Sequence, residues 1–216
     1  MKFEQIYEKD EFGIIKQKEK KSFLYNQDYL GERYVIIKDK CINMSYLRLG
    51  FLLGNISGKI NSLLDFGCGS GYFLEVASDC IENTYNYDII DNNFSHSQKL
   101  DYEDIFSKKF DVVTFFDSLE HVEDPYTLIK KIDTKYIHIS VPWCHIQERG
   151  KDWFMNWKHR RHDEHLYHFN LDSLIRFFEY FGYKLIKYSN IEDTIRKSDE
   201  ENNILSCIFI KKEKIQ

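Results

Sequence analysis

The segment NSLLDFGCGSGYFLEVA, Asn61–Ala77, carries the clearest structural signal in the sequence. Three of the ten glycines of the chain occupy alternate positions in it, namely Gly67, Gly69 and Gly71. An apolar run that includes Asp65 precedes these glycines, and an apolar pattern with helical spacing follows them. This order predicts a strand, a tight turn and a helix in an α/β sheet.

Ligands of open α/β sheets bind outside the carboxyl ends of the strands, which is where this turn lies. Glycine permits a positive φ there and lets backbone N–H groups approach a ligand closely. A plain tight turn is the alternative explanation of the same glycines, because a lone glycine-rich loop is a weak signal.

Composition limits the classes of protein that the chain can belong to. Its 216 residues suit one domain, and the 43% of hydrophobic residues suffices for a sizeable core, which excludes wholesale disorder. The net charge of -5 argues against a nucleic-acid coat or a polybasic membrane binder.

The compartment is predicted from charge, hydropathy and cysteine usage. No apolar run approaches the length of a membrane span, and the N-terminal MKFEQIYEKDEFG is too charged for a signal peptide. The five cysteines are odd in number and form no CxxC pair. We therefore expect reduced thiols in a cytoplasmic protein, with neither disulfides nor a zinc site.

Strand and helix patterns alternate after an N-terminal extension at residues 1–40, which forms no clean element and could fold over a site as a lid. Strands are predicted at 61–66, 84–90, 110–116, 135–141, 183–189 and 204–212. Helices are predicted at 41–56, 72–80, 124–132 and 170–182. Alternation of this kind favours a doubly wound, mostly parallel sheet, and the two final strands predict an antiparallel hairpin at its C-terminal edge. Residues 41–216 would form this single domain.

Two acidic residues strengthen the case for a ligand site. Asp65 stands just before the glycines, where a carboxylate would lie next to an ammonium group. Asp88 ends the next strand, where it could accept the two hydroxyls of a ribose. The spacing is GxGxG rather than the GxGxxG of nicotinamide enzymes, and no second phosphate-binding element follows.

The combination resembles motif I and the acidic strand end of class I S-adenosylmethionine-dependent methyltransferases, over residues 45–212 and in the same order. The resemblance implies a Rossmann-like sheet of seven strands and S-adenosylmethionine as cofactor. By position, it implies that the cofactor-binding residues are Asp65, Gly67, Cys68, Gly69, Gly71, Asp88, Asp101, Tyr102 and Asp117. Glu103 and Asp104 compete with Asp101 for the adenine contact, and nucleotide-sugar or nicotinamide binding is the alternative for the site as a whole.

The stretch FFDSLEHVEDP contains a candidate metal site. On a helical turn Asp117, Glu120 and His121 would share one face and could hold a divalent cation such as Mg²⁺ or Mn²⁺. The stretch resembles the Glu-x-x-Glu-His metal motif of the ubiquinone-pathway O-methyltransferases and of enzymes that 2′-O-methylate small RNAs, with the shorter Asp117 in the first position. Structural hydrogen bonding of Glu120 and His121 is the alternative, which we favour.

A second candidate region is the segment 143–170, which follows the strand at 135–141 and is predicted to form a substrate lid. It holds five of the eight histidines and all three tryptophans. Together with His121, the candidate catalytic residues are His162, Asp163 and His165, of which His165 could instead be a fourth metal ligand. The candidate substrate contacts are Trp143, His145, Arg160 and Arg161. Packing of these histidines in the core is the alternative.

The function expected from these features is O-methylation of a small polar acceptor, such as a sugar, a cell-surface intermediate or a quinone-like precursor. Aromatic residues of the N-terminal extension could wall the acceptor pocket, namely Tyr25, Tyr29 and Tyr34. One alternative is a metal-assisted RNA 2′-O-methyltransferase, although the acidic balance argues against a nucleic-acid partner. An alternative of another class is an inactive cofactor-binding partner subunit.

Overall fold

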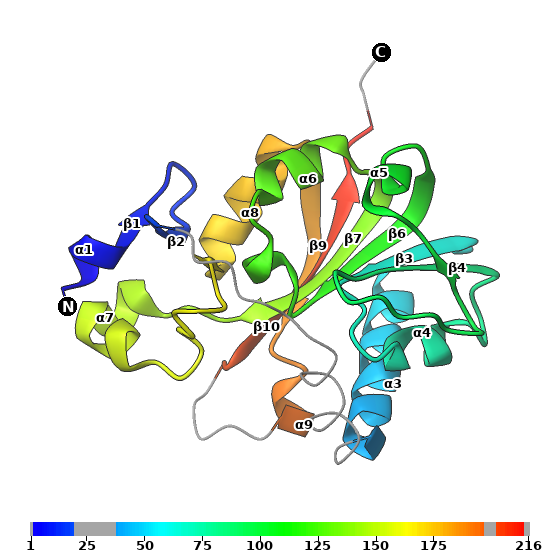
Figure 1. Ribbon diagram of the computed structural model, residues 1–216, viewed down its shortest axis with the longest axis horizontal. Helices are drawn as coiled ribbons and strands as arrows, with labels where there is room; N and C mark the ends of the chain where they lie inside the picture. The colour runs from blue at the N-terminus through cyan, green and yellow to red at the C-terminus, as the bar shows by residue number, and fades with distance from the viewer. Residues whose placement is uncertain (1, 20–37, 197–201, 214–216) are drawn as a thin grey trace.

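A computed structural model describes residues 2–19, 38–196 and 202–213. Its centre is a seven-stranded sheet with the strand order β5-β4-β3-β6-β7-β10-β9 (Figure 1). The strands are β3 (Ser62–Phe66), β4 (Asn83–Tyr87), β5 (Gln98–Lys99), β6 (Lys109–Phe116), β7 (Asp133–Pro142), β9 (Tyr183–Ser189) and β10 (Ile204–Lys211). The first five pair in parallel, and β10 is antiparallel to both β7 and β9. The predicted doubly wound sheet with its C-terminal hairpin is confirmed.

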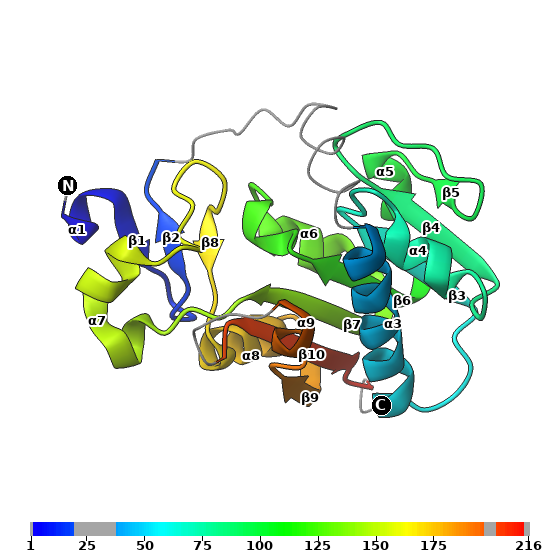
Figure 2. The same cartoon turned by 90° about the horizontal axis from the view of Figure 1, so that it is seen from below.

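Helices cover both faces of this sheet (Figures 1 and 2). They are α3 (Lys38–Asn55), α4 (Tyr72–Ala77), α5 (Tyr102–Ile105), the 3₁₀ helix η1 (Leu119–His121), α6 (Pro125–Lys131), α8 (Leu171–Tyr180) and α9 (Asp193–Arg196). Leu63 of β3 packs in one apolar cluster with α3 and α4, and the next residue, Leu64, packs in another with α6 and α8. Strand residues alternate between faces, so a run that is apolar throughout fills both cores.

Local signals determine where helices α6 and α8 begin, and these two helices were predicted with the closest bounds. The Asp124 side chain accepts from the Thr127 N–H at 3.0 Å, and Pro125 occupies the first turn of α6. The Asn170 side chain accepts from the Ser173 N–H at 2.8 Å in a capping box at the start of α8. Helix α8 then leads directly into β9, which begins the hairpin.

The N-terminal segment differs from its prediction, because most of residues 2–19 form regular structure. It contains α1 (Phe3–Ile6), β1 (Tyr7–Lys9) and β2 (Ile15–Gln17), which join α7 (Ile146–Asn156) and β8 (Tyr167–His168) of the segment 143–170. The second sheet has the order β1-β2-β8, and its elements lie together at one end of the molecule (Figure 2).

A third apolar cluster holds this small sheet together. It buries Phe3, Tyr7 and Ile15 of the N-terminal segment against Phe154 and Trp157. These contacts join residues far apart in the sequence, so no local pattern indicates them. Strands of three residues are also too short to show a period. The tyrosines proposed to wall the acceptor pocket, Tyr25, Tyr29 and Tyr34, lie outside the described residues.

All five cysteines are described, and none of them pairs with another in a disulfide there. Among the described residues, no helix combines the length and apolar character needed to cross a bilayer.

Candidate functional site

The turn between β3 and α4 is built from left-handed backbone. Gly67, Gly69 and Gly71 have φ values of 78°, 53° and 73°. Residues other than glycine adopt this left-handed backbone conformation at a cost in free energy. The Gly67 N–H donates to the Tyr87 carbonyl at 2.8 Å, which fixes the turn to the end of β4. The N–H groups of the turn therefore gather at the carboxyl edge of the sheet.

Asp88 joins the turn to the strand end from the other side. The Gly69 N–H donates to its Oδ2 at 2.8 Å, and the Ile90 N–H donates to its Oδ1 at 2.9 Å. Each carboxylate oxygen can accept a second hydrogen bond. The half-buried Asp88 is thus oriented by two backbone N–H groups and keeps the capacity to accept further hydrogen bonds.

Asp65 lies at the end of β3 and is almost completely buried. The Thr114 hydroxyl donates to its Oδ1 at 2.6 Å. Burial raises the pKa of Asp65 to about 6, against the opposing effects of Thr114 and Arg48. An ammonium group placed beside it would favour the ionised form, which fits the role predicted for this carboxylate.

Exposed ring and alkyl surface flanks Asp88. Tyr102, at the start of α5, is 37% exposed, and its ring lies 5.5 Å from that of Tyr87. Ile89 is 74% exposed and was not among the predicted site residues, although an apolar residue directly after an acidic strand end was a readable signal. Asp101 is exposed just before α5, and Cys68 is buried in the α3–α4 cluster, where burial raises its thiol pKa.

One part of the site proposed for the reaction lies directly after β6. Ser118 donates to the Phe66 carbonyl at 2.7 Å, which ties the end of β6 to the glycine turn. The next residues form η1, where Glu120 and His121 meet His165. One ligand atom from each of these three residues lies within 4.8 Å of the others. The structure therefore brings together two residues of the predicted metal motif and the proposed fourth ligand.

Burial shifts the pKa of all three groups toward the uncharged form. Burial, with Asp117 nearby, raises the pKa of Glu120 well above its usual range, and neither of its oxygens has a hydrogen-bond partner within the described residues. Burial lowers the pKa of both His121 and His165. Their Nδ1 atoms lie 3.0 and 2.7 Å from backbone carbonyls, which only accept, so Nδ1 carries the proton and Nε2 is the basic nitrogen.

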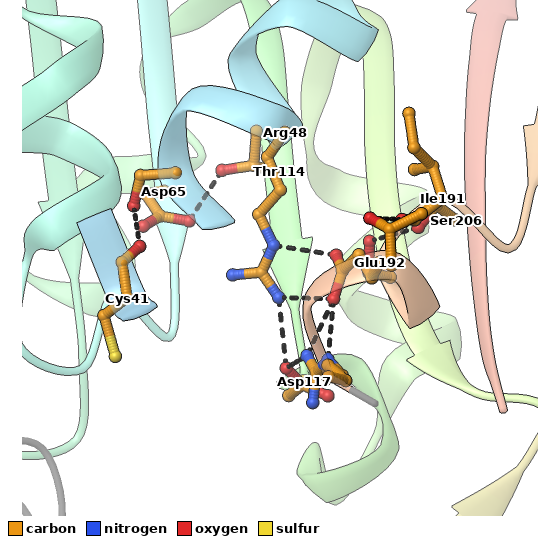
Figure 3. A network of polar contacts seen from close by, with 12 residues as sticks. Cys41, Arg48, Asp65, Thr114, Asp117, Ile191, Glu192 and Ser206 are labelled. Carbon is orange, nitrogen blue, oxygen red and sulfur yellow. Dashed lines mark hydrogen bonds and ion pairs between the residues drawn. The ribbon is translucent and has the colours of Figure 1, made fainter. Parts of the chain in front are cut away.

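Asp117, predicted as both a metal ligand and a cofactor contact, lies outside this group. It has a φ of 52°, and its carboxylate forms ion pairs with Arg48 and Arg196 (Figure 3). Both arginines also bind the buried Glu192. The sequence analysis assigned no role to Arg48, Arg196 or Glu192. The signal that it could have used was an arginine, Arg48, among the apolar residues of α3.

The remaining residues of the segment 143–170 are held mainly within the small sheet and its surroundings. His162 Nδ1 lies 3.2 Å from the Tyr7 hydroxyl, and Arg161 forms an ion pair with Glu164 at 2.9 Å. Asp163 is exposed, and Arg160 lies near Tyr7. Trp143 stacks on His145, whose Nε2 atom lies 2.8 Å from the Asn202 carbonyl.

Three solved structures share this fold at low sequence identity. The methyltransferase bound to the Trm112 methyltransferase activator of Haloferax volcanii is 12% identical, with a TM-score of 0.62 over 88% of this chain and 97% of that one. An S-adenosylmethionine-dependent methyltransferase of Archaeoglobus fulgidus is 20% identical, with a TM-score of 0.56 over 83% and 100%. The 1,6-didemethyltoxoflavin-N1-methyltransferase of Burkholderia thailandensis is 11% identical, with a TM-score of 0.59 over 96% and 100%.

Family membership follows from a sequence model. No curated protein sequence matches the chain significantly. The family model described as "Methyltransferase domain" matches residues 43–188, which include the glycine turn, Asp88 and η1. Given this match and the observed sheet, the chain belongs to the class I S-adenosylmethionine-dependent methyltransferases.

Proposed function

We propose that this methyltransferase methylates a hydroxyl group of a small polar acceptor, such as a sugar, a cell-surface intermediate or a quinone-like precursor. S-adenosylmethionine supplies an electrophilic methyl group on a sulfonium. The glycine turn, Asp65 and Asp88 would hold the donor through its ammonium and ribose groups, with Ile89 and Tyr102 against the adenine. The segment 143–170 would cover the acceptor.

The observation that carries the proposal is the group formed by Glu120, His121 and His165. A hydroxyl is a poor nucleophile until something takes its proton or lowers its pKa. The Nδ1 atom of each imidazole faces a backbone carbonyl, so Nε2 is the ring nitrogen that would accept the proton. Because Ser118 ties the end of β6 to the glycine turn, η1 follows directly beside the proposed donor site.

The same three residues fit a divalent cation. One carboxylate and two imidazoles form a mixed oxygen and nitrogen donor set, and the buried Glu120 oxygens lack partners within the described part of the chain. Mg²⁺ or Mn²⁺ bound here would lower the pKa of an acceptor hydroxyl. We propose these residues, without Asp117, as the ligands if the protein uses a metal.

His165→Ala should lower turnover about a hundredfold or more, because it removes either the proton acceptor or a metal ligand. Affinity for the demethylated product S-adenosylhomocysteine should change little, since His165 lies outside the glycine turn. Transfer of labelled methyl from S-adenosylmethionine to a panel of hydroxylated acceptors measures the first effect, and calorimetry measures the second.

His159→Ala is the matched control, because this imidazole binds the Asn203 side chain instead of joining the group. Equal losses of turnover and donor affinity in His165→Ala would contradict the proposal. Treatment with EDTA separates the two chemistries: a metal-dependent enzyme loses activity and regains it with Mn²⁺, and Glu120→Ala then behaves like the chelated enzyme. An enzyme that uses imidazole alone keeps its activity.

Donor affinity should fall nearly tenfold between about pH 7 and about pH 5, given that the pKa of Asp65 is about 6. The donor ammonium stays protonated over this range, whereas the Asp65 carboxylate that would bind it becomes neutral as the pH falls through its pKa. Calorimetry with S-adenosylhomocysteine at several pH values measures the slope. Asp65→Asn should bind weakly at every pH, and an unchanged slope in this variant would assign the titration to another group.

RNA 2′-O-methylation is the second candidate, because Glu120 and His121 match the last two positions of the metal motif that small-RNA methyltransferases share. The net charge of -5 argues against it. Methyl transfer to a 3′-terminal ribose, and none to free sugars, would favour it. A chain that binds the donor yet methylates neither class of acceptor would instead be an inactive partner subunit.

A further inference from the structure

A network of four charged side chains lies beside the proposed donor site. Arg48 of α3 and Arg196 of α9 converge on Glu192, which immediately precedes α9, and on Asp117 after β6 (Figure 3). The sequence analysis assigned no role to the two arginines or to Glu192. The network therefore represents chemistry that the proposed function has not used.

Glu192 binds both arginines through its carboxylate. It is completely buried, and its oxygens accept from Arg48 Nε at 2.8 Å, from Arg48 Nη2 at 3.1 Å and from Arg196 Nε at 2.9 Å. Burial alone would raise the pKa of Glu192, but the two guanidinium groups outweigh it and hold the pKa well below its usual range. An ionised carboxylate thus fixes two planar cations side by side.

Arg48 is restrained on a second side as well. Its Cζ atom lies 4.2 Å from the centroid of the Phe116 ring, in cation–π contact. The Arg48 side chain is only 13% exposed and that of Arg196 is 26% exposed. The two guanidinium groups form a rigid pair, which we call the arginine fork, with little freedom to rearrange.

Asp117 is the most exposed member of the network. Its side chain is 36% exposed, whereas that of Glu192 is 0% exposed. Its backbone adopts a φ of 52°, which is unfavourable for a residue with a side chain. The Nη2 atoms of Arg48 and Arg196 both donate to the same oxygen, Asp117 Oδ2, so the arginine fork directs two donors to one point.

The arginine fork and Glu192 together present a net positive charge at the position of Asp117 Oδ2. Two guanidinium groups and the Glu192 carboxylate sum to a single positive charge, which Asp117 neutralises. The site also borders the donor. Asp117 adjoins Ser118, which bonds to the Phe66 carbonyl just before Gly67, and Arg48 contributes to the electrostatics of Asp65.

We propose that the arginine fork binds an anionic oxygen of the methyl acceptor, a carboxylate or a phosphate, which displaces Asp117 toward solvent. Two convergent, preorganised guanidinium donors match the geometry of such an oxygen. Asp117 occupies its place while no acceptor is bound. This inference rests on the proposed function and narrows the acceptor to an anionic hydroxyl compound.

The test uses inorganic phosphate as the anion and the full chain saturated with S-adenosylhomocysteine, so that the donor site is filled. Thermal-shift titration at constant ionic strength gives the phosphate affinity. We expect Asp117→Asn to bind phosphate about tenfold more tightly or better, because the internal competitor loses its charge. We expect Arg196→Gln to weaken phosphate binding by about tenfold or more, since a charged donor is lost.

Exposed residues of α8 supply the controls: Asp172→Asn and Arg176→Gln should leave phosphate affinity unchanged. If Arg196→Gln does not fold, Arg196→Lys keeps the charge without the planar group and should also weaken binding. Equal phosphate affinity in the wild type and Asp117→Asn would overturn the inference and reduce the network to a contact between α3 and α9.

A second result would also overturn it. Affinity for S-adenosylhomocysteine should change less than about threefold in Arg196→Gln, because the donor and anion sites are separate. A loss as large as that for phosphate would assign the arginine fork to the donor carboxylate. Failure of the wild type to bind S-adenosylhomocysteine at all would reject the proposed donor site. Normal binding of S-adenosylhomocysteine without any binding of phosphate would instead reject the anion site alone.

Discussion

Replacing Asp88 with alanine should weaken binding of S-adenosylhomocysteine about a hundredfold or more. The carboxylate is expected to accept from two ribose hydroxyls, and hydrogen bonds to a charged group contribute about 1.5–3 kcal/mol each. The variant also removes the acceptor of the Gly69 N–H, so the turn that would hold the methionine part loses one of its ties to the end of β4. Calorimetric titration of the purified chain measures the loss directly.

Asp91→Ala is the appropriate comparison for this experiment. Asp91 lies three residues further along, is exposed, and pairs with Lys99 at the surface. Surface ion pairs contribute little, so this variant should bind the ligand like the wild type. If Asp88→Ala retained wild-type affinity, the ribose would have to be held elsewhere and the donor site as described would be wrong.

Gly67→Ala should destabilise the protein by about 2–4 kcal/mol, from a left-handed backbone and from overpacking. A Cβ atom at this position would lie 2.5 Å from Ser118 Cβ, and φ is +78°. Ser118 has little room to move, because it is buried and bonded to the Phe66 carbonyl. Thermal unfolding should show the change as a fall in Tm of about 4–16 °C for a domain of this size.

Gly58→Ala separates the two causes. Its φ is +88°, but a Cβ there would meet no atom within 4 Å, so it reports the backbone cost alone. The double variant Gly67→Ala/Ser118→Gly should recover part of the lost stability by making room for the methyl group. A Tm for Gly67→Ala equal to that of Gly58→Ala would show that the contact with Ser118 adds nothing.

The donor half of the molecule was predictable because its signals are local. The glycine turn, Asp65 and the adjoining strand and helix lie within one short stretch, and Asp88 ends the next strand. Parallel βαβ units place consecutive strand ends at one edge of the sheet, so sequence order gives spatial proximity. The two-residue strand β5 escaped prediction because it is too short to show a period.

The acceptor half was harder to predict because its contacts are distant in sequence. The partners of Asp117 come from α3 and from the connection between β9 and β10, far from it on either side. His165 reaches Glu120 only because the segment 143–170 folds back over η1, where the Leu166 N–H donates to the Glu120 carbonyl at 2.9 Å. Helical spacing suggested Asp117 as a ligand, but long-range ion pairs determine its position.

The small sheet also sets an order of assembly. Its central strand, β2, precedes its partner β8 by some 150 positions in the chain. Donor-side strands can pair soon after they emerge from the ribosome, whereas the hairpin of β1 and β2 cannot gain its third strand until residues 167–168 have been made. The wall that carries His165 is therefore completed only after β3, β4, β6 and β7 of the donor-binding half have been made.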